Sequence, residues 1–267
     1  MSGVSLELES ITVLRSGRHI LDVDKLSISA GQFVNIIGTN GAGKTTLLKV
    51  LCGLIKPSSG KVFFGNIALT SLSPWNRTNL KKQVGYIPQS AEYNSELPFT
   101  VREVVVMGRT SAKRLLSGLT KADYDSADRW IDRVGLSGQK DQTFRSLSGG
   151  EQQKALIARA MVQNPKVLML DEPTSNLDFH WKGKISRLVK DLQKQLNLTV
   201  LIISHELTSI PIETDRTILL DRGKIIADGS SETVLTSEQI AQVYKCRINV
   251  CEINGNKYII NQDVTTV

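Results

Sequence analysis

Residues 38 to 45 could bind the phosphates of a nucleotide. Their order has the GxxxxGK[ST] spacing of a phosphate-binding loop, and the segment consists of Gly38, Thr39, Asn40, Gly41, Ala42, Gly43, Lys44 and Thr45. Glycines lack the Cβ atoms that would stop backbone N–H groups from surrounding a phosphate, and the helix expected from Lys44 adds the positive end of its dipole. We expect Lys44 to reach the β- and γ-phosphates and Thr45 to reach Mg²⁺. The alternative is a glycine-rich turn that matches by chance, and the apolar run before it at residues 33 to 37 argues against that.

Two carboxylates follow a second apolar run and could complete such a site. Asp171 and Glu172 come directly after residues 166 to 170, which read Lys-Val-Leu-Met-Leu. The carboxyl end of a strand in a parallel sheet would place both acids beside the phosphate loop. We expect Asp171 to anchor Mg²⁺ and Glu172 to polarise the attacking water as a general base. A solvated acidic loop is the alternative, and the preceding strand together with the phosphate loop favours the site.

A third segment could form a second anion-binding helix end. Residues 147 to 153 read Leu-Ser-Gly-Gly-Glu-Gln-Gln, and they open an expected helix with Ala155, Ala158 and Met161 on one side. Two glycines before a helix suit an anion, although an ordinary helix cap explains them as well. Two phosphate-binding helix ends so far apart in one chain suggest that each nucleotide is shared between two protomers.

The start of the chain has the pattern of antiparallel strands. Residues 4 to 8 alternate between apolar and polar types, and an extended stretch at 20 to 28 follows the turn at Ser16-Gly17. Residues 62 to 64 are expected to join this layer. By contrast, the apolar runs at 34 to 37, 167 to 170 and 200 to 203 are separated by helical patterns, as in a parallel sheet buried on both faces. The fold class is therefore α/β, a P-loop NTPase core with a parallel sheet, an N-terminal antiparallel β-layer and an inserted helical subdomain.

The insertion and the C-terminal part have patterns of their own. Thr120 and Asp123 can cap a helix whose apolar residues fall on one face. After Gly223 we expect a short strand, a helix that ends near Lys245, and a hairpin around Asn254-Gly255. One domain at 1–267 is thus divided into a core at 1–90 and 162–225, a helical insertion at 91–161 and a C-terminal appendage at 226–267.

Length and composition favour a cytoplasmic protein. The 267 residues are 40% hydrophobic, and the longest apolar runs are far shorter than the ~20 residues that span a bilayer. The N-terminus lacks the pattern of a secretion signal, and Cys52, Cys246 and Cys251 do not make a disulfide framework. The net charge of +7 suits nucleic acid, anionic lipid or nucleotide, so it leaves the partner open. Any membrane role is expected to be peripheral.

The order of these motifs resembles the ATPase subunits of ABC transporters over nearly the whole chain. The resemblance is carried by residues 38 to 46, Gln89 after residues 84 to 88, residues 147 to 153, the acids at 171 and 172, residues 175 to 178, and His205 after residues 202 to 204. Alone, Gln89 would be a surface amide and His205 a strand-end histidine. The resemblance implies that Gln89 faces both the Mg²⁺ and the membrane partner. It also implies that His205 contacts the γ-phosphate and that Asp178 helps to join two protomers.

Further residues are similar to the ATPases of iron-siderophore, haem and cobalamin importers. These are residues 100 to 109, the helix start at Leu119-Thr120, and the end near residues 243 to 245 with its short hairpin. Importers of zinc, manganese or molybdate share parts of this pattern. The resemblance implies that Mg·ATP is held between two protomers. One protomer supplies residues 38 to 46, which include Thr46, and the other supplies Ser148, Gly149 and Gly150.

Arg15 departs from the family pattern. It stands just before Ser16-Gly17-Arg18, where many ABC ATPases carry an aromatic residue that stacks on adenine. A guanidinium is planar and can lie over a purine or pair with phosphates, while a solvated turn arginine is the alternative.

We also expect a groove near residues 89 to 101, with Leu97, Pro98 and Phe99 at its rim, to receive a short helix of the permease.

The sequence thus predicts the ATP-hydrolysing subunit of an importer. It would use ATP and Mg²⁺, form a head-to-tail homodimer on membrane permease subunits at the cytoplasmic face of the cell membrane, and work indirectly with a substrate-binding protein. Nucleic acid is not an expected partner. One alternative is a soluble ABC-type ATPase acting on nucleic acid or ribosomes, a class that usually carries paired ATPase units or a long coiled-coil insertion. The other alternative is the ATPase of an exporter.

Overall fold

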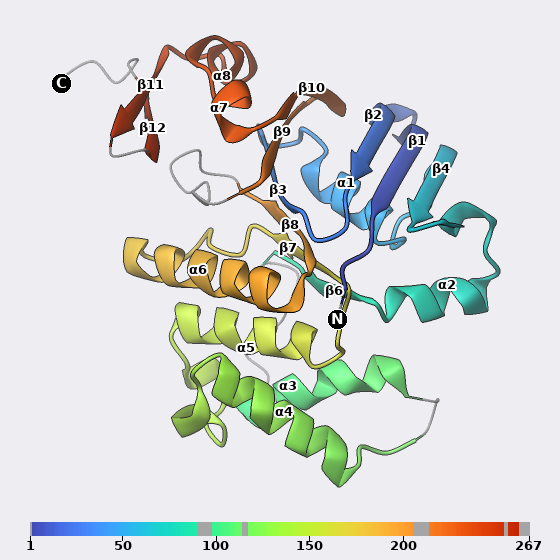
Figure 1. The fold of residues 1–267 in the computed structure, drawn as a ribbon, viewed down its shortest axis with the longest axis vertical. Helices are drawn as coiled ribbons and strands as arrows, with labels where there is room; N and C mark the ends of the chain where they lie inside the picture. The colour runs from blue at the N-terminus through green and yellow to red at the C-terminus, as the bar shows by residue number, and fades with distance from the viewer. Residues whose placement is uncertain (1, 90–97, 114–116, 205–213, 254–255, 262–267) are drawn as a thin grey trace.

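A mainly parallel sheet lies at the centre of the fold. The structure, a computed structural model, describes residues 2–89, 98–113, 117–204, 214–253 and 256–261 (Figure 1). Within these ranges the sheet has the order β10-β9-β3-β8-β7-β6, with β10 antiparallel to β9 at one edge. Every residue of β3, β7 and β8 is buried, as expected for strands covered on both faces. The strands are β3 (Phe33–Gly38), β6 (Val84–Ile87), β7 (Val167–Asp171), β8 (Thr199–Ile203), β9 (Arg216–Asp221) and β10 (Lys224–Gly229).

A second, antiparallel sheet is formed by the N-terminal strands. Its order is β2-β1-β4-β5. Ser16 and Gly17 connect β1 to β2, and both have a positive φ, 48° and 74°, as a two-residue hairpin turn of this hand requires. Leu6 and Leu8 of β1 are fully buried because they alternate with polar neighbours and face the core. The strands are β1 (Leu6–Arg15), β2 (Arg18–Ile28), β4 (Ser59–Phe64) and β5 (Ile67–Ala68).

Helices and the antiparallel layer cover opposite faces of the main sheet. Leu168 and Leu170 of β7 pack in one hydrophobic cluster with α3 to α6, whereas Val167 and Met169 pack in a second cluster with α1 and the antiparallel strands. In Figure 1 the helices of the first cluster lie below the sheet and the strands β1, β2 and β4 lie at the upper right. The helices are α1 (Lys44–Leu51), α2 (Pro74–Lys81), α3 (Val101–Val106), α4 (Lys121–Arg133), α5 (Gly149–Met161) and α6 (Phe179–Leu196).

The C-terminal elements pack against the main sheet through a third cluster. Ile240 and Val243 of α8 contact this cluster together with Leu219 of β9. Strand β3 contributes to all three clusters: Phe33 to the helical side, Val34 and Ile36 to the antiparallel layer, and Ile37 to the C-terminal cluster. The C-terminal elements are α7 (Ser231–Val234), α8 (Ser237–Tyr244), β11 (Ile248–Ile253) and β12 (Asn256–Asn261), of which the two strands pair antiparallel.

The predicted fold class is confirmed. The parallel core, the antiparallel layer and the helices α3 to α5 lie where the sequence placed them, and the capping box of Thr120 and Asp123 is present at the start of α4. The strands that flank Asn254-Gly255 form the predicted hairpin arms, although these two residues lie outside the described ranges. The division of the chain into core, insertion and appendage stays a prediction. Among the described helices, none combines the length and the apolar character that crossing a bilayer requires.

Candidate active site

The phosphate loop connects the end of β3 to the start of α1. Gly38 ends the strand with φ 152°, and a Cβ there would overlap the carbonyl oxygen of Leu220. Gly43 has φ 100°, and a Cβ there would come within 2.8 Å of the carbonyl oxygen of Ile20. Only glycine fits at these two positions, because each backbone passes close to another strand end. Both positions therefore require glycine, the residue type that lets a backbone approach a phosphate closely.

Lys44 places a buried cation at this loop. Its Nζ donates hydrogen bonds to the carbonyl oxygens of Gly38, at 2.8 Å, and Thr39, at 2.9 Å. Burial lowers the pKa of the Lys44 ammonium, while the charges of Glu172 and Asp171 raise it and so oppose the shift. A loop that requires glycine and holds an ammonium at its centre fits the phosphates of a nucleotide.

Asp171 connects β7 to the phosphate loop and to β6. The carboxylate is fully buried; Thr45 Oγ1 donates to its Oδ1 at 3.1 Å, and the hydroxyl of Tyr86 donates to its Oδ2 at 3.3 Å. The described residues contain no group of three or more His, Cys, Asp or Glu side chains that could hold a metal ion. Mg²⁺ suits this arrangement, since it is commonly bound by one or two protein oxygens together with phosphates and water. Thr45 and Asp171 supply two such oxygens.

Glu172 and Gln89 meet although 83 residues separate them. Gln89 Nε2 donates to Glu172 Oε2 at 2.9 Å. They come together because β6 and β7 are adjacent parallel strands, so the segments that follow them leave the sheet at the same edge. Glu172 has φ 50°, a left-handed conformation that is uncommon for a side chain of this kind and typical of functional sites. In this conformation the Glu172 carboxylate contacts Gln89.

The helix α5 begins at the predicted second anion site. Ser148 caps it in a capping box: its side chain accepts from the N–H of Glu151, and the Glu151 carboxylate accepts from the Ser148 N–H at 2.9 Å. The helix-cap alternative is thus correct as a local description. The capping box does not exclude phosphate binding, because the backbone N–H groups of the first turn remain at the positive end of the helix. The phosphate role of Ser148, Gly149 and Gly150 stays a prediction.

Other predicted residues have less defined surroundings. Thr39 Oγ1 donates to Asp221 Oδ1 at 3.4 Å, Asn40 is exposed and Thr46 is half-buried on α1. Arg15 is exposed at the end of β1, opposite Arg18. His205 and residues 90 to 97 lie outside the described residues, so their predicted roles stay predictions.

Sequence reasoning missed Tyr86 as a site residue. The available signal was a hydroxyl-bearing aromatic residue in the otherwise apolar run just before Gln89. Asp221 was missed as well. It ends β9, and β9 adjoins β3 in the sheet, so its carboxylate reaches the phosphate loop. Both residues lie on strands adjacent to those that carry the predicted site, so they can be assigned to it only once the strand order is known.

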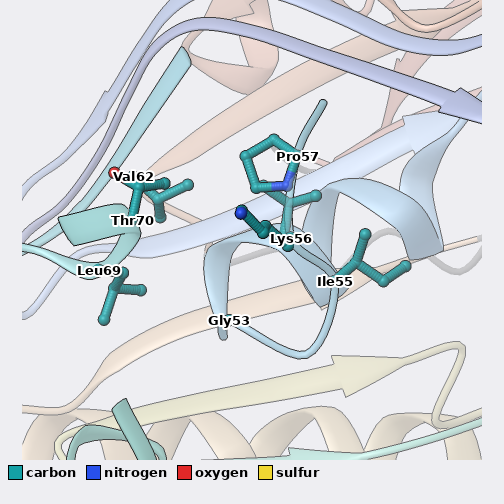
Figure 2. Close-up of a pocket in the computed structure, with 8 residues that line it drawn as sticks. Gly53, Ile55, Lys56, Pro57, Val62, Leu69 and Thr70 are labelled. Atoms are coloured by element: carbon teal, nitrogen blue, oxygen red, sulfur yellow. The ribbon is translucent and has the colours of Figure 1, made fainter. Parts of the chain in front are cut away.

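A shallow pocket lies at the other end of α1 (Figure 2). It encloses about 250 Å³, including space open to solvent, and contains no carboxylate. Its walls are mainly apolar, so this pocket lacks the groups needed for phosphate chemistry. The lining residues are Val50, Gly53, Ile55, Lys56, Pro57, Val62, Leu69 and Thr70.

Comparisons with known proteins agree with this geometry. A sequence profile of the ABC transporter family matches residues 21–175. A hemin import ATP-binding protein of Rhizobium meliloti (strain 1021) is 34% identical over 270 residues, which cover 97% of this chain and 99% of that protein. A metal-chelate type ABC transporter solved in an inward-facing conformation has a TM-score of 0.82 at 25% identity, covering 97% of this chain and 98% of that one. A dimeric ATP-binding cassette in a post-hydrolysis state, bound to ADP and Pi, has a TM-score of 0.73 at 28% identity, covering 84% and 97% of the two chains.

Proposed function

Because this chain belongs to the ABC transporter family of ATP-binding proteins, we propose that it binds and hydrolyses ATP to drive transport through a membrane permease. The observation that carries the proposal is the assembly of three groups at one edge of the main sheet. The ammonium of Lys44 lies in the phosphate loop, the hydroxyl of Thr45 contacts Asp171, and Glu172 is paired with Gln89. A cation, a pair of oxygen donors for a metal and a candidate base are the groups that phosphoryl transfer to water requires.

Each side chain has a distinct task in this proposal. When bound, Mg²⁺ would neutralise charge on the β- and γ-phosphates, and Thr45, Asp171 and Gln89 would hold it there. Lys44 exchanges its backbone acceptors for phosphate oxygens. Glu172 accepts a hydrogen bond from the attacking water, and Gln89 orients that carboxylate through its amide. His205 is proposed to contact the γ-phosphate.

The complete site is proposed to need a second copy of the chain in a head-to-tail dimer. Support comes from the dimeric state of the related cassette and from Phe179, whose side chain is 91% exposed directly after Asp178. Covering this phenyl ring with a partner would remove apolar surface from water, which favours association. ATP would then lie between one protomer's phosphate loop and the other's Ser148 to Gly150.

The transported cargo is proposed to be an iron-siderophore, haem or cobalamin type substrate, taken up through permease subunits at the cytoplasmic face of the membrane. The hemin import relative and the metal-chelate type transporter support this class and the direction of transport. The helical insertion at 91–161 and the segment near Gln89 are proposed to contact the permease. A substrate-binding protein would act on the far side of the membrane.

A reconstitution experiment tests the proposal. The chain would be placed in vesicles with the permease and the binding protein encoded beside its gene, with ATP inside and labelled ferric siderophore, haem or cobalamin outside. We expect ATP-dependent accumulation of one of these substrates. Uptake of zinc alone would correct the cargo class, and efflux would correct the direction. Salt-sensitive binding to DNA or RNA, without uptake or efflux, would favour the nucleic-acid alternative.

Arg15 is expected to contribute to nucleotide affinity by lying over the adenine ring. The hairpin that carries it continues into Ile20, whose carbonyl oxygen lies against Gly43 of the phosphate loop. A cation–π contact of about 0.5–2 kcal/mol corresponds to roughly 2- to 30-fold in affinity. Arg15→Ala should therefore weaken binding of a fluorescent ATP analogue by that factor, and Arg15→Tyr should recover it. Arg18→Ala, on the opposite strand of the hairpin, is the matched control. Equal affinities in all four proteins would show that Arg15 is surface charge.

A further inference from the structure

The first turn of α6 is fixed to the segment that precedes it. Asp178 caps the helix, and its Oδ1 accepts a hydrogen bond from the backbone N–H of Trp181 at 2.9 Å. Because a cap of this kind holds both residues in one helical turn, the backbone of Trp181 has a defined position relative to Asp178. No sequence motif marks Trp181 as a functional residue.

The indole ring of Trp181 lies directly on Gly150 of α5. A Cβ placed on Gly150 would fall inside van der Waals contact with three atoms of the ring. Similarly, a Cβ on Gly149 would approach Leu177 Cδ2 to 3.1 Å. The two glycines are therefore covered by Leu177, which precedes α6, and by Trp181 in its first turn, and this close packing is a reason for glycine at 149 and 150 besides any phosphate contact.

Both helices also place a lysine over the same ring. Lys154 of α5 has its Nζ 5.5 Å from the ring centroid of Trp181, and Lys184 of α6 has its Nζ at 5.0 Å. Burial lowers the pKa of Lys154, the charge of Lys184 lowers it further, and Glu151 opposes the shift. Two like charges are thus tolerated close together because the electron-rich face of the ring attracts each of them. The ring is the common contact of the two helix ends.

We propose that Trp181 is a positioning residue that joins the start of α5 to the start of α6. The glycines at 149 and 150 then move with residues 175 to 178 as one unit when two protomers close on ATP. This inference rests on the proposed head-to-tail dimer. Trp181 touches neither nucleotide nor the reacting atoms; it acts through Gly150, and its effect is felt at the nucleotide held by the opposite protomer.

Removal of the ring should separate dimer closure from nucleotide binding. In a Glu172→Gln background, which should retain ATP, Trp181→Ala is expected to raise the ATP concentration needed for dimerisation at least tenfold, measured by analytical ultracentrifugation. Affinity of the monomer for the ATP analogue should stay within twofold, because the phosphate loop keeps its own contacts. Trp181→Phe should recover part of the dimerisation, since a phenyl ring can still cover Gly150.

A matched control distinguishes this role from general loss of stability. Trp130 of α4 is buried and has the guanidinium of Arg133 at 4.8 Å from its ring centroid, so Trp130→Phe makes the same aromatic replacement at another cation–π pair, on a helix other than α5 and α6. It should leave ATP-dependent dimerisation unchanged, with thermal midpoints recorded for all variants. Unchanged dimerisation in Trp181→Ala, or a loss in Trp130→Phe equal to that in Trp181→Phe, would overturn the inference.

Mixed dimers test in which protomer Trp181 acts. Lys44→Ala removes the phosphate-loop half of one site, so a dimer of one Lys44→Ala protomer and one Trp181→Ala protomer keeps one complete site if Trp181 serves the opposite nucleotide. We expect one trapped ATP per such dimer, and none if Trp181 supports its own phosphate loop. Pairing Lys44→Ala with Gly149→Asp checks the dimer itself. If that pair also traps none, the head-to-tail arrangement is wrong; if it traps one while the Trp181→Ala pair traps none, only the role of Trp181 is wrong.

Discussion

Glu172→Gln should bind ATP and dimerise normally while its turnover falls by about 10²–10⁴-fold, the contribution expected of a general base. Glutamine keeps the shape of the side chain, and its carbonyl oxygen can still accept the hydrogen bond that Gln89 Nε2 donates to Glu172 Oε2 at 2.9 Å. It lacks the basicity needed to accept a proton from water. The expected result is therefore a protein that closes on ATP and does not reopen, measured as phosphate release in the presence of the permease.

The control for this substitution is the same chemical change at an exposed position. Glu238 is exposed in the first turn of α8, and Glu238→Gln should hydrolyse ATP at the unmodified rate. A Glu172→Gln protein with normal phosphate release would show that another group is the base. Weaker ATP binding together with slower release would instead place Glu172 among the groups that hold the nucleotide.

Lys44→Ala should remove most of the affinity for ATP. The ammonium is buried, and hydrogen bonds to charged groups contribute about 1.5–3 kcal/mol, which corresponds to roughly 10- to 150-fold in the dissociation constant. The loss should be larger for ATP than for AMP, because we expect Lys44 to reach the outer phosphates. Isothermal titration calorimetry with ATP, ADP and AMP measures this difference.

Lys49→Ala on the same helix is the matched control, since it changes net charge by the same amount at the far end of α1. It should leave all three affinities within twofold. If Lys44→Ala bound ATP as tightly as the unmodified protein, the phosphate loop would not be the nucleotide site. An equal loss for AMP and ATP would point to distortion of the loop and away from a lost phosphate contact.

The sequence was sufficient for the fold class, and its motifs pointed to two segments that the structure brings together, residues 38 to 45 and residues 171 to 172. Apolar runs without alternation identified β3, β7 and β8, because strands buried on both faces need no polar positions. The glycine pattern identified the phosphate loop for a similar reason: at Gly38 and Gly43 the backbone approaches other strand ends so closely that only glycine fits. In both cases the surroundings of the segment are reflected in its own residue types, so it can be recognised without knowing its neighbours.

Contacts between neighbouring strands and between neighbouring helices could not be predicted in this way. The hydrogen bonds from Tyr86 to Asp171 and from Gln89 to Glu172 form because β6 and β7 are adjacent in the sheet. The residues of neither strand indicate that order. The contact of Trp181 with Gly150 depends on how α6 is rotated against α5. The positive φ of Glu172 is set by the turn that follows β7, and a glutamate gives no signal for it.

The membership of β3 in three hydrophobic clusters has a consequence for local unfolding. Phe33, Val34 and Ile37 each belong to a different cluster, and β8 and β9 pair with the strand on both sides. We expect its amide hydrogens to be among the slowest to exchange with solvent, because opening any one cluster leaves the strand packed in the other two. Movement of the helical side, the antiparallel layer or the C-terminal elements alone would then leave β3 in place. The start of the phosphate loop is therefore expected to lie in the part of the chain that opens last.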